Sequence, residues 1–271
     1  ISSVSNLYAD TLENLSARFS ESSAEFVSSL IPGEGLTEVD VKIETKEEAS
    51  FSILGVRDLD KRENSNFFTQ FSLHNRSVSD DERYIANIGF GRRYLNSDKS
   101  MMYGANAFVD TDIFNEHARL SIGAEARAKM LEFSANMYQG LSPVRTIDGS
   151  DEEAMDGTEY NLASQIPHMP WAVFNYQYYK WFGITNGASN RGDIFSLELA
   201  LSPTLNFDVT RDISNHPDGN TYGVLLTFVY PPRENKPTLL DGFMSEDRFV
   251  KENMEEHLSG KVRRNNSLTV E

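Results

Sequence analysis

Apolar residues recur at every second position through most of the chain between residues 37 and 231. The clearest case is the stretch 103–125, YGANAFVDTDIFNEHARLSIGAE, where two such runs flank a polar turn. The apolar positions of the two runs are Tyr103, Ala105, Ala107, Val109, Ala118, Leu120, Ile122 and Ala124. This period predicts a β-hairpin with one apolar and one polar face. The apolar face must meet either a protein core or lipid.

The same period predicts twelve strands. We expect them at 37–45, 50–58, 66–74, 83–95, 100–110, 117–127, 129–140, 158–166, 172–182, 193–202, 204–212 and 221–231. An even number of long strands with alternately short and long connections suits a closed transmembrane barrel. Aromatic residues gather toward the strand ends, as in the interfacial girdles of membrane proteins. A soluble β-sandwich or barrel is the alternative, although it needs neither strands of this length nor an aromatic girdle.

Two segments outside the strands have helical spacing. The pattern of residues 7–30 predicts one amphipathic helix that ends at Pro32 and Gly33. Residues 245–258 predict a second helix, capped by Ser245 and followed by Gly260. The expected fold class is therefore all-β, a twelve-stranded antiparallel transmembrane barrel with a helix on either side. The expected domains are 1–36 for the first helix, 37–231 for the barrel, and 232–271 for the second helix and an extended linker.

Composition narrows the function further. With 41 acidic and 25 basic residues, the formal charge of −16 argues against a nucleic-acid partner. The chain has no cysteine, which excludes disulfides and thiolate metal sites. No run of about 18 apolar residues is present, so no transmembrane helix is expected. The N-terminus has neither the basic nor the apolar part of a signal peptide, so any signal peptide has already been removed.

The polar faces of the strands supply the candidate site. A barrel would turn these residues toward its lumen: Arg93, Asn106, Asp110, Arg119 and Glu125. Opposite charges on adjacent strands can pair across the ladder. One interpretation is a lining that lets an extended polypeptide slide and then holds it, and the other is an ordinary salt-bridged interior. Similarly, the two arginines at 263 and 264 either meet an acidic lumen or form a solvated charge pair near a terminus.

Motifs for catalysis or metal binding are weak. Asp110, Thr111 and Asp112 are better explained as turn residues, because aspartate side chains cap turns locally. The acidic loop at 148–156 lacks the ligand spacing of an EF-hand, and the chain has no HExxH, Gly-x-Ser-x-Gly or phosphate-binding loop. His117, near the two aspartates, is the one defensible catalytic pairing. We therefore expect no enzyme, no cofactor and no metal.

The order of these parts resembles the β-domain of the intimin and invasin family, the inverse autotransporters. The segments that carry the resemblance are RYIANIGFGRRYL, MYGANAFVDTD, HARLSIGAE, SANMYQGLSP, DGTEYNLASQIPHMPW, and LSG followed by VRRNNSLTVE. Each motif is short, but their order and spacing are fairly specific. The resemblance extends from about Leu12 to Glu271.

The resemblance implies a twelve-stranded barrel in the outer membrane of a Gram-negative bacterium, with the first helix in the periplasm. It also implies that the linker passes back through the pore to the surface, where a C-terminal passenger follows. The pore-threading residues would be Arg263, Arg264, Asn265 and Asn266. The expected partners are outer-membrane lipid, the outer-membrane assembly machinery, and the chain's own passenger or another surface protein.

The resemblance is incomplete at both ends of the chain. Glu271 stands where a passenger should begin, and no peptidoglycan-binding module precedes Leu7. The sequence thus predicts a translocation and anchoring domain for a C-terminal passenger. The alternatives are a passenger-less barrel that acts as a scaffold in a larger envelope or surface assembly, and a diffusion porin plugged by its own tail.

Overall fold

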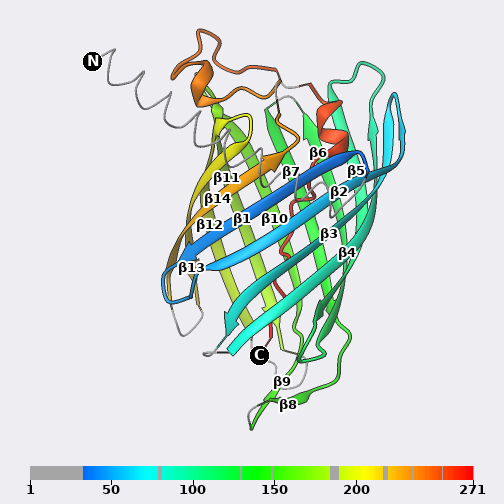
Figure 1. Ribbon diagram of the computed structural model, residues 1–271, viewed down its shortest axis with the longest axis vertical. Coiled ribbons are helices and arrows are strands. Elements are labelled where there is room, and N and C mark those ends of the chain that lie inside the picture. The colour runs from blue at the N-terminus through cyan, green and yellow to red at the C-terminus, as the bar shows by residue number, and fades with distance from the viewer. Residues whose placement is uncertain are drawn as a thin grey trace.

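A closed antiparallel barrel makes up most of the molecule (Figure 1). The computed structural model describes residues 33–78, 81–128, 130–147, 149–183, 189–215, 219–233, 235–251 and 253–270. The barrel strands are β1 (Gly35–Glu44), β2 (Ser50–Arg62), β3 (Ser65–Val78), β4 (Asp81–Leu95), β5 (Met101–Asp112), β6 (Ala118–Ala128), β7 (Leu131–Gly140), β10 (Asp156–Ile166), β11 (Met169–Phe182), β12 (Ser189–Ser202), β13 (Leu205–Ser214) and β14 (Thr221–Tyr230). All twelve strands expected from the period are confirmed, and most are longer than the sequence pattern alone indicated.

Each strand pairs with its neighbours in the chain, and β1 also pairs with β14 to close the sheet. Closure leaves none of these twelve barrel strands with an unpaired edge, which a sheet in lipid requires. The loop between β7 and β10 adds a small separate hairpin, β8 (Arg145–Ile147) and β9 (Ser150–Glu152). The sequence pattern did not predict this hairpin.

The two faces of the sheet differ as the alternation predicts. Along β5 the exposure alternates, with Asn106 and Asp110 buried and Tyr103 and Val109 exposed. The same alternation leaves large apolar side chains such as Ile122 about half exposed on the outer surface. Exposing a continuous belt of such side chains to water is unfavourable, so the outer face is suited to lipid. The polar face lines the lumen.

The two ends of the barrel are different. One end carries the turns 63–64, 96–100, 129–130, 167–168 and 203–204, and the chain also leaves β14 there; we call it the short-turn end. The opposite end carries the connections 45–49, 79–80, 113–117, 141–155, 183–188 and 215–220, most of them longer, and is the long-loop end. The last residues of the chain lie at the long-loop end, beside β8 and β9 (Figure 1).

The predicted helix at 245–258 is wrong. The described part of residues 235–270 contains only two short 3₁₀ turns, η1 (Leu239–Asp241) and η2 (Glu256–Ser259). The backbone of the intervening segment binds the β10–β11 turn instead, because Ser245 N–H donates to the His168 carbonyl and His168 N–H donates to the Arg248 carbonyl, both at 2.8 Å. Contacts with the rim therefore replace the hydrogen bonds of a helix.

The helix predicted at 7–30 lies outside the described residues. Among the residues that are described, no helix is long and apolar enough to cross a membrane.

Candidate functional site: the lumen and the tail inside it

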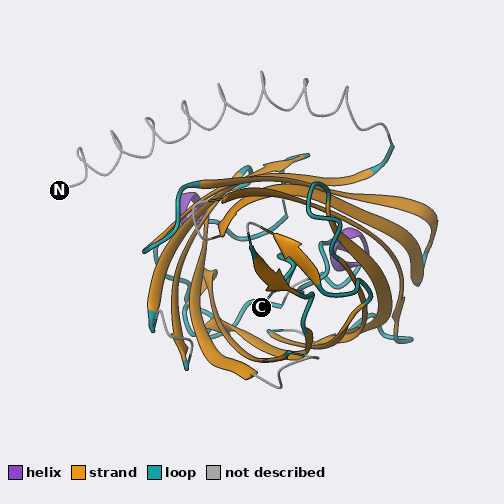
Figure 2. Cartoon of the chain, turned by 90° about the horizontal axis from the view of Figure 1, so that it is seen from below, coloured by secondary structure: helices purple, strands orange, loops and turns teal. Residues whose placement is uncertain are grey.

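Residues 258–270, here called the tail, run through the lumen from the short-turn end to the long-loop end (Figures 1 and 2). Wall side chains of β3, β4, β6 and β7 donate hydrogen bonds to its backbone carbonyls. The pairs are Asn66 with Leu258 at 3.0 Å, Arg93 with Gly260 at 2.5 Å, Asn136 with Arg263 at 3.0 Å, Arg119 with Asn265 at 3.1 Å and Asn87 with Asn266 at 2.9 Å. Within the lumen, several carbonyls of this extended segment are thus satisfied by wall side chains, as buried backbone groups require.

Arg93 and Glu125 form a buried pair where the tail enters. Arg93 Nε donates to Glu125 Oε1 at 2.7 Å and Nη2 donates to Oε2 at 3.1 Å, a bidentate arrangement. The guanidinium also lies 4.4 Å from the ring centre of Phe68. That ring can lie flat on the wall because position 91 is glycine, where a Cβ would be 2.4 Å from it.

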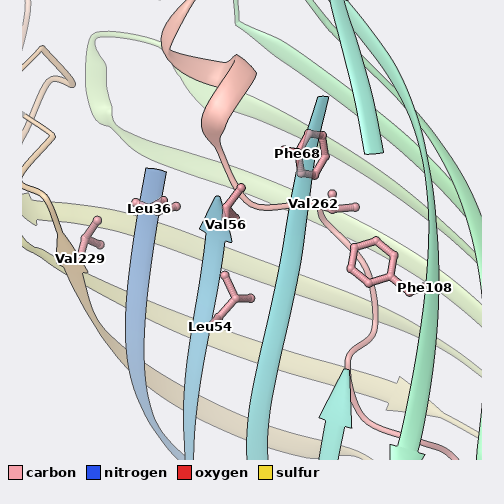
Figure 3. Close-up of a cluster of buried hydrophobic side chains, with 7 residues drawn as sticks. All are labelled: Leu36, Leu54, Val56, Phe68, Phe108, Val229 and Val262. Carbon is pink, nitrogen blue, oxygen red and sulfur yellow. The ribbon is translucent and has the colours of Figure 1, made fainter. Parts of the chain in front are cut away.

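The next two tail residues take different environments. Lys261 Nζ lies 2.6 Å from Glu38 Oε2, and Arg233 contacts the other oxygen of the same carboxylate. Val262 N–H donates to Gln70 Oε1 at 2.8 Å. The Val262 side chain enters an apolar cluster, shown in Figure 3, with Leu36, Leu54, Val56, Phe68, Phe108 and Val229.

Arg263 contacts two carboxylates that come from separate strands. It lies 3.3 Å from Glu132 of β7 and within ion-pair distance of Glu198 of β12. It therefore spans the lumen between the wall that binds the tail carbonyls and the opposite wall.

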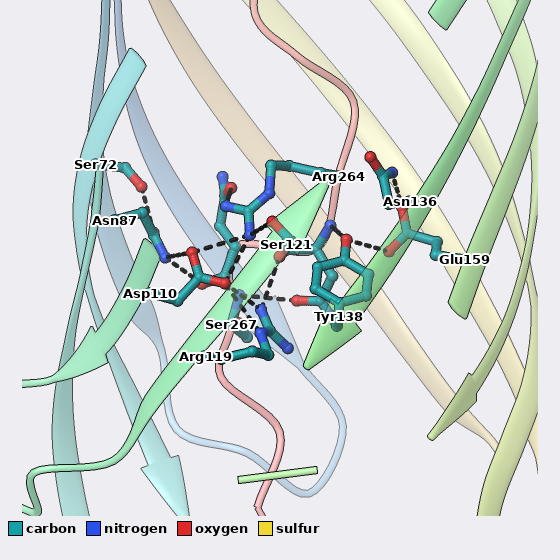
Figure 4. A network of polar contacts seen from close by, with 12 residues as sticks. Ser72, Asn87, Asp110, Arg119, Ser121, Asn136, Tyr138, Glu159, Arg264 and Ser267 are labelled. Carbon is teal, nitrogen blue, oxygen red and sulfur yellow. Dashed lines mark hydrogen bonds and ion pairs between the residues drawn. The ribbon is translucent and has the colours of Figure 1, made fainter. Parts of the chain in front are cut away.

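Arg264 is fully buried and shares one carboxylate with a wall arginine (Figure 4). Its Nη2 donates to Asp110 Oδ2 at 2.6 Å, and Arg119 Nη2 donates to the same oxygen at 2.8 Å. The Arg264 guanidinium lies 4.3 Å from the ring centre of Phe108 and the Arg119 guanidinium lies 4.4 Å from that of Tyr138. Aromatic faces thus assist in holding two desolvated cations.

Tyr138 links this group to a second carboxylate (Figure 4). Its hydroxyl donates to Glu159 Oε2 at 3.2 Å and accepts from Asn265 N–H at 2.9 Å. Two arginines and two carboxylates therefore belong to one hydrogen-bonded network, so the buried charges are balanced when the tail is in place.

The tail ends against the loop between β7 and β10. Ala154 and Val270 form an antiparallel bridge, and Met155 N–H donates to the Thr269 carbonyl at 3.0 Å. Leu268 packs with Ala154 and Ile85. The acidic segment expected to be a solvated surface loop thus binds the tail where it leaves the lumen.

The residues weighed for catalysis are part of the turn structure at the long-loop end. Asp112 Oδ1 accepts the backbone N–H groups of Phe114 and Asn115 at 3.3 and 3.2 Å. His117 is fully buried, with Nδ1 3.2 Å from Ser142 Oγ and Nε2 3.7 Å from Glu152 Oε2. Burial lowers the pKa of His117 below its usual value.

Of the expected lining residues, Arg93, Asp110, Arg119 and Glu125 lie in the networks described above. Asn106 is also buried on the inner face of β5, but its Nδ2 has no hydrogen-bond partner among the described residues. Sequence reasoning missed several lumen groups that the structure places in these networks: Glu38, Glu132, Tyr138, Glu159 and Glu198. The available signal was the strand period, since each occupies a polar-face position within an expected strand.

The fold and the lumen define the class of protein. It is an antiparallel β-barrel with an apolar outer belt, which crosses a membrane and holds its own C-terminal segment inside. The chain belongs to the inverse autotransporter β-domain family, whose model matches residues 4–222. That membership places it in the outer membrane of Gram-negative bacteria.

Three relatives illustrate the family. A protein of Escherichia coli strain K12, named as an attaching and effacing protein homolog, is 31% identical over 43% of this chain and 39% of its own length. Invasin of Yersinia enterocolitica is 32% identical over 38% of this chain and 12% of its own length. The inverse autotransporter adhesin YeeJ of E. coli K12 is 29% identical over 52% of this chain and 6% of its own length. The chain thus spans well under half of each relative.

The fold also matches a solved membrane-protein chain reported in work on in-meso crystallization. The match has a TM-score of 0.71 and 18% identity and covers 88% of this chain and 98% of the other. At that identity the likeness concerns the fold alone.

Proposed function

We propose that this chain is the translocation and anchoring domain of an inverse autotransporter, which exports a C-terminal passenger and displays it at the cell surface. The observation that carries the proposal is the course of the tail. The tail enters at the short-turn end and leaves beside Ala154 at the long-loop end. Outer-membrane barrels have short periplasmic turns and longer external loops, so this direction leads outward.

The wall contacts suit both passage and retention. Backbone carbonyls occur at every residue, so wall donors such as Asn87, Asn136 and Arg119 can bind whichever residue lies opposite. Retention requires side chains that fit one place only. Val262 fits an apolar cluster and Arg264 fits Asp110 between aromatic rings.

If the tail shifted by two residues along the lumen, the contacts of Val262 and Arg264 would be lost. The shift would bring the Arg264 guanidinium to the apolar position of Val262 and leave Asp110 with Arg119 alone. Burying a charge among apolar groups is strongly unfavourable. The tail is therefore held in one register, which makes the barrel an anchor as well as a passage.

The names of the relatives extend the proposal to a partner. One relative is named an adhesin and another an invasin, and both are much longer than this chain. We infer that the passenger is an adhesive surface module, and that the outer-membrane assembly machinery inserts the barrel.

An epitope placed after Glu271 tests the export function. In intact Gram-negative cells, we expect antibody to bind that epitope, whereas the same epitope placed before Ile1 should become accessible only after the outer membrane is permeabilised. The N-terminal fusion serves as the matched control because the barrel and the epitope are the same in both. A barrel that inserts but leaves the C-terminal epitope inside would refute export and favour a scaffold role.

A further inference from the structure

A cavity of about 740 Å³ remains in the lumen beside the tail. Much of its wall comes from β10 to β14 and β1, whereas the tail carbonyls bind the opposite wall. The cavity extends from Pro232 and Lys236 at the short-turn end to Asn175 and Thr210 inside the barrel. Export and anchoring of the tail, as argued above, leave this part of the lumen unused.

Three acceptor groups follow a diagonal across the cavity wall. Asp40 of β1 lies opposite Thr227 of β14, and Thr227 lies opposite Asn206 of β13. Asp208 is two residues further along β13. Asp208 lies opposite Glu198 of β12, and Glu198 lies opposite Val173 of β11. Asn175 is again two residues further along β11. Each step crosses two strand spacings and shifts by two residues in the same direction. From standard sheet dimensions, successive Cα atoms along this diagonal are about 12 Å apart.

The two carboxylates on this diagonal have no ion-pair partner among the described residues. Asp40 accepts hydrogen bonds from two hydroxyl groups, those of Ser52 at 2.9 Å and Thr227 at 2.6 Å. Asp208 lies opposite Glu198 in the register, and no described residue forms a hydrogen bond with its Oδ1. Like charges directly opposite on neighbouring strands repel.

The tail's cations make their close contacts elsewhere. Lys261 contacts Glu38, and Arg263 contacts Glu132 and Glu198. Lys261 also acts electrostatically on Asp40 and Asp208. Neither carboxylate has an ion-pair partner at contact distance among the described residues, so both can still accept N–H donors from an additional cation.

Asn175 provides independent evidence for a ligand. This residue lines the cavity and is only 4% exposed, yet its side-chain Oδ1 has no hydrogen-bond partner in the described part of the chain. A buried amide oxygen without a donor is unfavourable, so this group favours a ligand that brings N–H donors.

The spacing decides the kind of cation. No three His, Cys, Asp or Glu side chains in the described ranges are grouped so that they could hold a metal ion. A long cation with several separated ammonium groups can reach acceptors that one metal ion cannot. Leu225 lies opposite Asp208 on β14 and also lines the cavity, so an apolar surface is available between the acceptors.

We propose that this cavity binds a linear polyamine along the line from Asp40 through Asp208 to Asn175. Its ammonium groups donate to the two carboxylates and to the amide oxygen, and its methylene groups pack against Leu225. The site requires no movement of the tail.

Isothermal titration calorimetry of the folded full-length chain with spermidine tests this site. We expect saturable binding, an affinity about tenfold lower in Asp208→Asn and in Asp40→Asn, and tighter binding in Asn175→Asp, which adds a carboxylate on the diagonal. Asp151→Asn removes a carboxylate from exposed β9 and is the matched control, with unchanged affinity expected.

Absence of saturable binding would overturn the proposal, as would equal affinity in Asp208→Asn and Asp151→Asn. Competition by Mg²⁺ at the same concentration as spermidine would also refute it, because the site would then recognise charge and not an elongated polyamine. The gain expected from Asn175→Asp keeps the site testable even if a loss-of-charge variant folds poorly.

Discussion

Asp110 is the residue on which the tail's charge balance depends. It receives hydrogen bonds from Arg119 and Arg264, and all three side chains are fully buried. Removing either arginine leaves the aspartate with the other, whereas removing the aspartate leaves two buried cations together. Substitutions within this group should therefore differ greatly in cost.

We expect Asp110→Ala to lower the free energy of unfolding by about 3–5 kcal/mol, the usual cost of stranding a buried charge. Arg264→Met should cost only about 1–3 kcal/mol, because it removes charged hydrogen bonds but keeps an apolar stem against Phe108. Urea unfolding in lipid vesicles, followed by tryptophan fluorescence, measures both. Arg145→Met, which breaks an exposed pair with Glu116, is the control and should have little effect. A cost of Arg264→Met equal to that of Asp110→Ala would contradict the shared-carboxylate account.

His117 should make stability depend on pH. Burial lowers its pKa in the folded protein below the ordinary value of 6.5, so below that pH the unfolded chain takes up the proton more readily. The contribution of neutral His117 to the free energy of unfolding is therefore fully present above pH 6.5 and decreases as the pH falls below that value. We expect His117→Gln to lose less stability than the parent between pH 7 and pH 5, measured by the same unfolding assay. Parallel loss in the two proteins would exclude this role.

Among the elements, the strands were predictable and the connections were not. Period two arises because one face of each strand meets lipid and the other the lumen, and this constraint acts along all of β5 or β7. The segment at 245–258 has a helical pattern in isolation, but the β10–β11 turn supplies its hydrogen-bond partners. The ion pairs of Glu132 and Glu198 depend on where the tail lies, which no local pattern reports.

The loop 141–155 should hold the end of the tail. Met155 N–H donates to the Thr269 carbonyl, beside the bridge between Ala154 and Val270. Ala154 and Val270 are therefore a non-hydrogen-bonded pair of the antiparallel type, for which the Cα separation is about 4.5 Å. That separation allows a disulfide. Because the chain has no cysteine, Ala154→Cys with Val270→Cys should give one intramolecular disulfide on mild oxidation, detected by gel mobility without reductant.

The control for this cross-link is Thr146→Cys with Val270→Cys, since Thr146 lies on β8 and pairs with Asp151 of β9, whereas Val270 pairs with Ala154. Equal cross-linking in the two pairs would indicate that the loop does not hold the tail in this register.

For the whole molecule, the barrel closes without the tail. The β1–β14 pairing completes the sheet, and no tail residue takes part in the ladder. The tail should therefore be removable without loss of the fold, and its removal should free the lumen and leave the carboxylates of Glu38, Glu132 and Glu198 without their tail cations.

We expect a chain truncated before Lys261 to show a larger ion conductance than the full-length chain in planar lipid bilayers, with a preference for cations over anions. Heat-dependent gel mobility checks that the truncated barrel is folded. If both proteins are equally silent, the tail is not what closes the pore.

The carbonyl contacts along the tail also have a consequence for evolution and engineering. A bond from Arg93 to the carbonyl of Gly260, or from Arg119 to that of Asn265, is made to the backbone and so does not itself require a particular side chain at either position. The tail can therefore accumulate substitutions at such positions while the wall stays unchanged, provided that the buried residues Leu258, Val262, Arg264 and Leu268 keep their character. One barrel could thus be recombined with many different linkers and cargoes by exchanging the chain on either side of a few fixed residues.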